Sequence, residues 1–280
     1  MKKISRRSFL AAAGLSVAAL ALTACGGSSA STASSVASSA AASSEAASTS
    51  AAAGELTTVE AGKLTMATNA TFPPYEMTTD AGDIEGIDVD TAKAIAEKLG
   101  LELQIDDMDF DAALLSVQQG KADIAMAGIT VTDERKAVMA FSDSYATGIQ
   151  SIIVPEGSDI ASPDDLAGKK IGTQRGTTGY IYCSDDFGDE NVVAYDDGLT
   201  AVQALNNGQV DAVVIDNAPA QEFVAANPGL KVLDTSYAEE DYAIGMAKGS
   251  ALEDAVNKAL EELKADGTLQ AIVDKYIKAE

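Results

Sequence analysis

From residue 63 onward the chain alternates between short apolar runs and longer segments with one apolar face. The short runs are rich in small and β-branched residues and predict buried strands, whereas an apolar repeat of three to four positions predicts amphipathic helices. Strands are expected at 63–68, 101–106, 122–128, 148–154, 169–174, 191–195, 210–216, 230–234 and 241–247. Helices are expected at 86–100, 111–120, 132–139, 162–168, 175–186, 199–209, 218–227 and, as a closing pair, 250–277. This alternation predicts an α/β fold with two lobes and mostly parallel sheets.

Several residues mark where the expected helices begin and end. Gly100 and Gly120 follow the last apolar positions of two helices, where a left-handed glycine commonly ends a helix. Thr132 precedes two acids and is expected to cap the next helix, and Pro163 suits the first position of another. These signals place the helix ends to within a few residues.

Two segments of the chain resemble each other in layout. Residues 114–130 and 201–219 each read as a helix, a glycine stop and a buried strand. In open α/β sheets the crevice beyond the carboxyl ends of the strands is where ligands bind. The residues that follow these two strands are therefore candidates for a binding site.

The first residues predict an export signal. Lys2, Lys3, Arg6 and Arg7 precede an apolar run of about 14 residues, Phe9–Leu22, which is too short for a membrane span of roughly 20. We therefore predict a signal peptide at 1–24. The paired arginines leave both the general and the twin-arginine export routes open.

The residues around Cys25 resemble the lipobox of bacterial lipoproteins. The sequence Leu-Thr-Ala-Cys ends the apolar run, and in lipoproteins such a cysteine becomes the first, lipid-bearing residue (diacylglyceryl, palmitate). The alternative is an ordinary signal peptide with an incidental cysteine. The resemblance implies a protein anchored through Cys25 to the outer face of the cell membrane.

A Ser- and Ala-rich segment follows, so that 25–56 reads as the lipidated cysteine and a disordered tether. Its 29 residues from Gly26 to Gly54 contain one charge, Glu45, and no aromatic residue. Such a segment buries too little apolar surface to offset its ordering entropy. A flexible chain of this length reaches about 30 Å.

Charge and cysteine content exclude several classes of function. Four of the 19 Lys and Arg lie in the predicted signal, which leaves 15 against 43 Asp and Glu, a balance of −28. Nucleic-acid binders carry basic surfaces, so we expect no nucleic-acid partner. After Cys25 only Cys183 remains, and with no histidine in the chain to activate it we interpret it as a small buried hydrophobe.

Five stretches in order resemble the polar amino-acid family, family 3, of ABC-importer solute-binding proteins. They are 71–76 (TFPPYE), 86–99 (GIDVDTAKAIAEKL), 108–145, 172–179 (GTQRGTTG) and 211–220 (DAVVIDNAPA). The block 108–145 is especially similar to glutamine-binding proteins. The segment 86–99 differs from the family signature at Thr91, where the signature has an aliphatic residue.

The resemblance implies a two-lobed periplasmic-binding-protein fold of type II with two hinge crossings. The lobes would comprise 63–148 with 244–280, and 149–243, and the crossings would lie near 148–152 and 241–245. The implied protein is a monomer without a cofactor or metal, which closes around an amino acid and delivers it to ABC permease subunits. Its affinity would be micromolar or tighter, about −8 kcal/mol.

One half of the expected ligand clamp lies in the stretch Ala127–Arg135. Arg135 offers a forked donor for the ligand's carboxylate, whereas its alternative role is a surface ion pair with a neighbouring acid. Gly128 lets the backbone approach closely, and Thr130 adds a hydroxyl. The match to the family at Ala127, Gly128 and Thr130 favours the ligand role.

The other half is expected from the second lobe. Residues 175–178 place backbone N–H groups and the hydroxyls of Thr177 and Thr178 at a helix start, where they would hold the same carboxylate. Asp216 would pair with the ligand's ammonium group, or else cap the helix that follows. Asn69 stands where many relatives have Asp, so the ammonium would have one acid fewer.

The walls of the pocket are expected to choose the ligand's side chain. Phe72 and Phe110 are candidates for apolar walls, whereas core packing is the preferred role for Tyr75. Glu76 and Gln174 could contact a polar terminus, and Gln174 replaces a basic residue of some relatives. Glutamine-like ligands come first, with glutamate, cystine and basic amino acids left open.

Two other functions were weighed. One is a dehydratase-like enzyme of the same fold, which is disfavoured because no histidine and no evident Ser–Lys or Cys–His pair could act as acid or base. The other is a stand-alone sensory ligand-binding protein, although such domains are normally fused to a membrane helix or output module. The sequence therefore predicts a binding protein and no catalytic residue.

Overall fold

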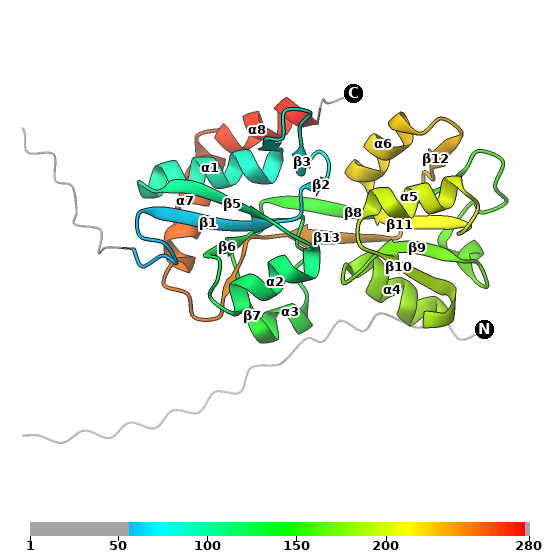
Figure 1. Ribbon diagram of the computed structural model, residues 1–280, viewed down its shortest axis with the longest axis horizontal. Helices are drawn as coiled ribbons and strands as arrows, with labels where there is room; N and C mark the ends of the chain where they lie inside the picture. The colour runs from blue at the N-terminus through cyan, green and yellow to red at the C-terminus, as the bar shows by residue number, and fades with distance from the viewer. Residues whose placement is uncertain (1–55, 278–280) are drawn as a thin grey trace, which may run out of the picture. The chain divides into compact units, whose positions relative to one another are not determined.

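The computed structural model describes residues 56–277, so the predicted signal peptide, Cys25 and most of the predicted tether lie outside the described residues. Helices and strands alternate from β1 (Lys63–Thr68) to α8 (Thr268–Tyr276), as the apolar pattern predicts. They form two lobes, each built on its own sheet (Figure 1). None of the helices within 56–277 is long and apolar enough to cross a bilayer.

The first lobe is built on a five-stranded sheet in the order β5–β1–β6–β14–β7. Its strands are β1, β5 (Glu102–Asp107), β6 (Ile124–Ala125), β7 (Met139–Phe141) and β14 (Gly245–Ala247). Its helices are α1 (Ile87–Leu99), α2 (Phe110–Gln118), α3 (Asp133–Val138), α7 (Glu253–Ala265) and α8. Side chains alternate across the sheet, so Leu64 and Met66 pack in the core formed with α1 and α7, whereas Ala67 packs in the core formed with α2.

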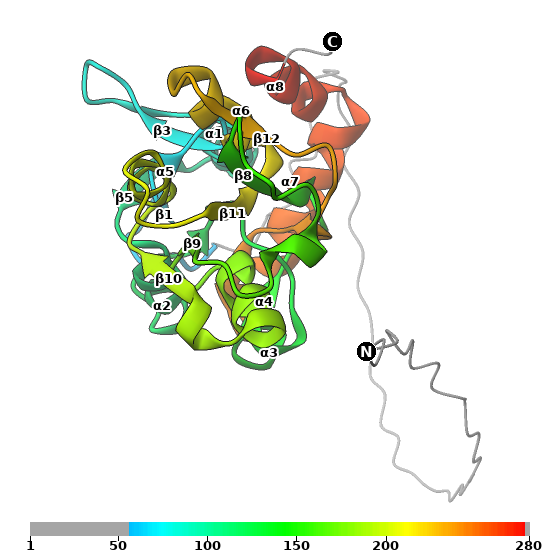
Figure 2. The ribbon, with the colours of Figure 1, turned by 90° about the vertical axis from the view of Figure 1, so that its right-hand side faces the viewer.

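The second lobe is built on a six-stranded sheet in the order β10–β9–β11–β8–β12, with β13 also paired to β8. Its strands are β8 (Ala146–Pro155), β9 (Ile171–Gln174), β10 (Val192–Tyr195), β11 (Ala212–Asp216), β12 (Leu230–Val232) and β13 (Ala238–Tyr242). Its helices are α4 (Thr178–Phe187), α5 (Gly198–Asn206) and α6 (Asn217–Ala226). Figure 2 looks onto this lobe, in which α5 and α6 pack with Ile153 and Val213 on one face of the sheet, and α4 with Ile152 and Val214 on the other.

The expectation of mostly parallel sheets is wrong. In the first sheet β1 pairs in parallel with β5 and β6, but β14 is antiparallel to both of its neighbours. In the second sheet β8 is antiparallel to β11, β12 and β13. Each sheet therefore mixes a parallel βαβ half with antiparallel strands, a feature that the run of alternating elements does not reveal.

Other differences from the predicted elements concern short strands. The hairpin sheet of β2 (Thr71–Phe72), β3 (Glu76–Thr78) and β4 (Ile84–Glu85) was not predicted, nor was β7. The run 241–247 is two strands, β13 and β14, which belong to different sheets, and 162–168 contains only the 3₁₀ turn η1 (Pro163–Leu166). Strands of two or three residues carry too few alternations for a period to be read.

The chain passes twice between the sheets. One passage lies at 142–145, between β7 and β8, and the other at 243–244, between β13 and β14. Positions 148–152, expected for the first crossing, form part of β8. Because β8 and β13 pair with each other, the two passages run side by side (Figure 1).

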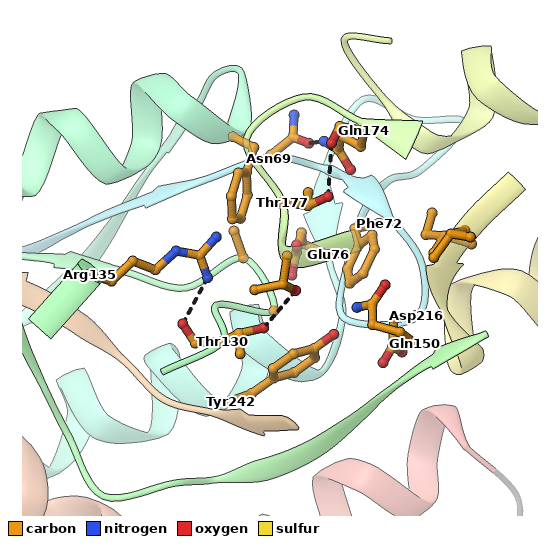
Figure 3. Close-up of a pocket in the computed structure, with 16 residues that line it drawn as sticks. Asn69, Phe72, Glu76, Thr130, Arg135, Gln150, Gln174, Thr177, Asp216 and Tyr242 are labelled. Atoms are coloured by element: carbon orange, nitrogen blue, oxygen red, sulfur yellow. Dashed lines mark hydrogen bonds between the residues drawn. The ribbon is translucent and has the colours of Figure 1, made fainter. Parts of the chain in front are cut away.

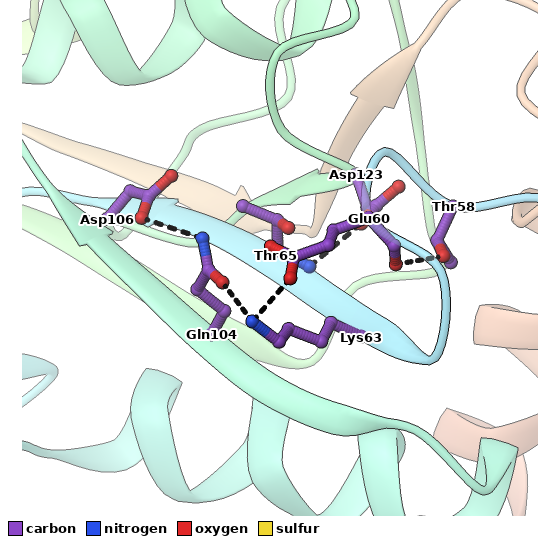
Figure 4. Close-up of polar contacts among 7 residues, drawn as sticks. All are labelled: Thr58, Glu60, Lys63, Thr65, Gln104, Asp106 and Asp123. Atoms are coloured by element: carbon purple, nitrogen blue, oxygen red, sulfur yellow. Dashed lines mark hydrogen bonds and ion pairs between the residues drawn. The ribbon is translucent and has the colours of Figure 1, made fainter.

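The segment that leads into β1 is fastened to the first lobe by Asp123. The backbone N–H groups of Val59 and Thr65 each donate to one oxygen of this carboxylate, both at 2.8 Å. Lys63 forms an ion pair with Glu60 at 2.6 Å and donates to Gln104 at 3.1 Å (Figure 4). The chain thus enters the fold at the end of β1 that lies away from Asn69.

Candidate functional site

A pocket lies where the carboxyl ends of the strands of the two lobes face each other (Figure 3). The empty space between its walls, including the part that is open to solvent, measures about 430 Å³. Its lining residues are Asn69, Phe72, Glu76, Phe110, Ala127, Gly128, Thr130, Arg135, Gln150, Gln174, Thr177, Thr178, Val214, Ile215, Asp216 and Tyr242. All eleven residues that the sequence predicts for the ligand site are among them.

Arg135 lies on the first turn of α3, where the Thr132 hydroxyl accepts from its backbone N–H at 3.2 Å. Its guanidinium donates to the carbonyl of Thr130 at 2.8 Å and to the carbonyl of Gly176, in the second lobe, at 3.2 Å. It also lies over the ring of Phe110, 5.3 Å from the centroid. The side chain is therefore buried between the lobes and is not the surface ion pair considered as its alternative role.

Burial changes the electrostatics of this arginine. Removal from water lowers the pKa of Arg135, and the nearby Glu240 carboxylate acts in the opposite direction. An arginine remains charged under all ordinary conditions. The pocket therefore holds a fixed, desolvated positive charge, which is the setting in which a carboxylate is bound most strongly.

Gly128 brings the backbone close to two aromatic rings. Its φ of +55° lies in the left-handed region, and a Cβ built there would lie 2.8 Å from the Phe72 ring and 3.2 Å from the Tyr242 ring. Its N–H donates to the buried carboxylate of Asp88 at 3.0 Å. Burial raises the pKa of Asp88 to about 6, and the hydrogen bond from Gly128 works against that effect.

An amide pair joins the lobes at the pocket's edge. Gln174 Nε2 donates to Asn69 Oδ1 at 2.8 Å, and Thr71 also donates to this oxygen. The Asn69 amide nitrogen donates to the carbonyl of Met108 at 3.0 Å. Both polar atoms of the Asn69 amide thus form hydrogen bonds within the protein. Gln174 is therefore the better placed of the two to change its hydrogen bonds when a ligand binds.

The start of α4 contributes two threonines. Thr177 caps the helix by accepting from the N–H of Tyr180 at 3.4 Å, and its hydroxyl donates to the carbonyl of Gln174 at 2.8 Å. Thr178 is buried, with its hydroxyl oxygen 3.3 Å from that of Thr130 in the other lobe. Free N–H groups at the first turn of a helix favour an anion at this place.

Asp216 ends β11 and caps α6, so the role weighed as its alternative is present in the structure. One oxygen accepts from the N–H of Ile149 at 2.6 Å and the other from Ala218 at 3.1 Å. The side chain also lines the pocket. Burial raises the pKa of Asp216 to about 6 despite these two hydrogen bonds, so its ionised form lacks a counter-charge of its own.

Glu76 is the most deeply buried charged side chain of the lining, with 0% of its surface exposed. No N–H or hydroxyl group of residues 56–277 donates to either carboxyl oxygen, but the carboxyl group of Asp88 lies close enough to share a proton with Glu76. Burial, together with the nearby Asp88, raises its pKa well above the ordinary value. An ionised carboxylate buried beside a second acid is costly, and a cation brought to it would lower that cost.

The aromatic residues divide between wall and core. Phe72 and Phe110 line the pocket, whereas Tyr75 lies behind them, stacked on Phe72 with centroids 5.8 Å apart and edge-on to Tyr242 at 5.5 Å. Cys183 is a residue of α4, and its side chain is buried in the core between that helix and the sheet, as the sequence predicts. Sequence reasoning missed Gln150, Val214, Ile215 and Tyr242 as lining residues.

The signal for the missed residues was present only in part. Val214 and Ile215 directly precede Asp216, so the strand end could have drawn attention to them. Gln150 and Tyr242 lie on β8 and β13, the paired strands of the second lobe that adjoin the two passages, and they reach the pocket from there. Their position depends on the antiparallel pairing that the sequence does not disclose.

The fold and the pocket together define a class of protein. Two α/β lobes joined by two strand passages, with a pocket of opposed charges between them, are the architecture of solute-binding proteins. Residues 64–279 match the model of the family of bacterial extracellular solute-binding proteins, family 3. The chain belongs to this family, whose members are binding proteins and not enzymes.

Individual relatives bind amino acids. The chain is 33% identical to a "Probable histidine-binding protein" of Neisseria gonorrhoeae, over 96% of this chain and 95% of that one. It is also 33% identical to the "L-cystine-binding protein TcyJ" of Escherichia coli K12, over 79% of this chain and 85% of that one.

Solved structures agree with this grouping. An ancestral arginine-binding protein bound to glutamine is similar with a TM-score of 0.75 and 42% identity, covering 79% of this chain and all of that one. An ancestral arginine-binding protein bound to arginine gives a TM-score of 0.73 and 43% identity, covering 77% and 98%. These likenesses show the two-lobed fold.

Proposed function

We propose that the protein is the extracytoplasmic receptor of an ABC importer and that it binds one L-α-amino acid between its lobes. Cys25 would carry the lipid anchor at the outer face of the cell membrane, and 25–56 would be the tether. The lobes would be 63–148 with 244–280, and 149–243. The receptor would act as a monomer that delivers its ligand to the permease subunits.

The two charges of an amino acid have matching partners in the pocket. Arg135 would hold the carboxylate together with N–H groups at the start of α4, and Asp216 would hold the ammonium. Each charge-assisted contact of this kind contributes about 1.5–3 kcal/mol. The raised pKa of Asp216 supports its role, because an ammonium group would supply the counter-charge that this carboxylate lacks.

The side chain of the ligand would be basic, with arginine first. The observation that carries this choice is Glu76, a wholly buried carboxyl group of the lining that lies beside the buried acid Asp88 and receives no hydrogen bond from an N–H or hydroxyl group of residues 56–277. After Arg135 and Asp216 are matched to the zwitterion, this acid remains, and a guanidinium would pair with it. The known binding of arginine by a protein 43% identical supports the choice.

Glutamine remains the second candidate, as the sequence comparison first favoured. The amides of Gln174 and Asn69 could exchange hydrogen bonds with a side-chain amide, and a protein 42% identical binds glutamine. The two candidates differ in charge at the same end of the ligand. A variant that neutralises Glu76 should therefore lower the affinity for arginine but not the affinity for glutamine.

Calorimetry on residues 55–280 tests the proposal, first against all twenty amino acids and then with Glu76→Gln. If arginine is the ligand, this substitution weakens arginine binding by about tenfold or more, since a charged contact is lost. It leaves glutamine binding nearly unchanged. Glu97→Gln, at an exposed position of α1, is the matched control. Absence of binding to every amino acid would refute the receptor function.

A further inference from the structure

Glu240 lies on β13 behind the pocket and gathers three donors on one oxygen. Its Oε2 accepts from the hydroxyl of Thr178 at 2.9 Å, from Gln150 Nε2 at 3.0 Å and from the hydroxyl of Thr130 at 3.1 Å. Glu240 is 7% exposed and its three partners 4% or less. This carboxylate is therefore bonded to side chains of both lobes, away from competing water.

The backbone explains how Glu240 reaches Thr130. An antiparallel bridge joins Thr130 to Tyr242, and the N–H of Val131 donates to the carbonyl of Asp241 at 3.0 Å. Glu240 precedes Tyr242 by two residues, so both side chains leave β13 on the same face. β13, which leads into the second passage, thus sets the Glu240 carboxylate directly beside the two pocket threonines.

A threonine hydroxyl has one hydrogen to donate and two lone pairs that accept. A carboxylate only accepts, so each hydroxyl that hydrogen-bonds to Glu240 gives its hydrogen to it; these bonds, at 2.9 and 3.1 Å, are shorter than the 3.3 Å contact in which either hydroxyl could donate to the other. Thr130 and Thr178 are then left with lone pairs for any other partner. Their oxygens lie 3.3 Å apart, and two such acceptors side by side favour a shared N–H donor.

We propose that Glu240 is a positioning residue that makes the hydroxyls of Thr130 and Thr178 acceptors, so that they contact the ammonium group of the ligand. This inference rests on the proposed function and deepens it. It revises the role expected from the sequence, in which these hydroxyls donate to the carboxylate. The carboxylate is left to Arg135 and to backbone N–H groups, while the ammonium gains two neutral acceptors beside Asp216.

The assignment changes which part of the ligand these residues discriminate. A ligand without its ammonium group would bring no donor to Thr130 and Thr178, whose lone pairs would remain unsatisfied. A ligand without its carboxylate would lose its contact with Arg135 but keep the contacts with the hydroxyls. Two analogues of arginine separate these effects: 5-guanidinopentanoate, which lacks the ammonium, and agmatine, which lacks the carboxylate.

The test is calorimetric titration of the detergent-purified full chain with L-arginine and both analogues. In Glu240→Leu the hydroxyls are free to rotate, and the preference for L-arginine over 5-guanidinopentanoate should fall by about tenfold or more. The preference over agmatine should not fall, because removing the negative charge of Glu240 near Arg135 does not weaken the contact of that arginine with the ligand's carboxylate. Glu240→Gln should retain most of the first preference, because its amide oxygen can still accept from both threonines.

Each result bears on the inference. An unchanged preference over 5-guanidinopentanoate in Glu240→Leu overturns the role of Glu240, as does a loss that falls equally on both analogues. If Glu240→Leu does not fold, Thr130→Val decides, because it should lower the same preference alone; a loss of preference over agmatine would mean that the hydroxyl serves the carboxylate. If the wild type binds no amino acid, the proposed function itself fails.

Discussion

Asparagine at position 216 separates the two roles of Asp216, which caps α6 and faces the pocket. The wild-type carboxylate is buried, and burial raises its pKa from 3.8 to about 6. Because the pKa is higher in the folded chain than in the unfolded one, this residue favours folding at low pH. That contribution is lost as pH rises from 3.8 through about 6.

The size of this effect follows from the two pKa values. The difference between 3.8 and about 6 corresponds to about 3 kcal/mol, at about 1.4 kcal/mol per pKa unit. Asparagine cannot ionise, so Asp216→Asn does not lose stability in this pH range. It does lose one acceptor, since its amide nitrogen must face the N–H of Ile149 or Ala218, at a cost of about 1–3 kcal/mol that does not depend on pH.

Denaturant unfolding of residues 55–280 without ligand, at pH 4 and at pH 7.5, measures the two contributions separately. Between these pH values the free energy of unfolding of Asp216→Asn should rise relative to the wild type by about 2.5 kcal/mol, somewhat less than the full difference because the unfolded carboxyl group is already partly ionised at pH 4. Asp211→Asn is the matched control, because Asp211 is exposed and accepts one backbone N–H, from Lys170 at 2.8 Å. Its stability relative to the wild type should not change with pH in this way.

The same variant should bind its amino acid about 10- to 100-fold more weakly, because the ammonium loses a charged partner. Weaker binding together with relative stabilisation at pH 7.5 would show that Asp216 lowers the stability of the ligand-free protein and contributes to ligand binding. A constant stability difference between pH 4 and pH 7.5 would refute the reasoning from burial. Unaltered affinity would remove Asp216 from the ligand site.

Four further results are expected. Arg135→Lys should weaken binding by about 10- to 100-fold in calorimetry, because a single ammonium cannot replace the fork. Gly128→Ala should lower stability by about 1–2 kcal/mol in denaturant unfolding and abolish binding, since φ is +55° and the new methyl group meets Phe72. Binding of either amino acid should strengthen from pH 5 to pH 7.5, because burial raises the pKa of Asp216 to about 6, and arginine binding should strengthen more than glutamine binding, because the pKa of Glu76 is raised as well. Cys25→Ser should move the protein from the membrane to the soluble fraction in cell fractionation.

Much of the fold could be predicted from local pattern. The alternation of apolar runs and amphipathic segments places the α/β elements correctly because each strand or helix of five or more residues repeats its period several times. The pairing direction of the strands could not be read in this way. It depends on which strands β8, β13 and β14 pair with beside the two passages between the lobes, which is a property of distant contacts.

The pocket shows the same division between local and distant information. The residues that follow β6 and β11 directly, such as Thr130 and Asp216, could be placed at the strand ends and are in the lining. The hydroxyl of Thr130 could not be assigned a direction from sequence. Its hydrogen goes to Glu240, 110 positions away, and that contact exists only once β13 has paired beside residue 130.

The fastening of the entry segment by Asp123 has a mechanical consequence. A chain held at the membrane by its N-terminal end would transmit any pull through Val59 and Thr65 into the start of β1. At about 3.3 Å per residue, that point lies about 20 Å along the strand from Asn69 at the pocket. The load would thus act on the first lobe, at the end far from the pocket. The second lobe would remain free to close over the ligand without stretching the tether.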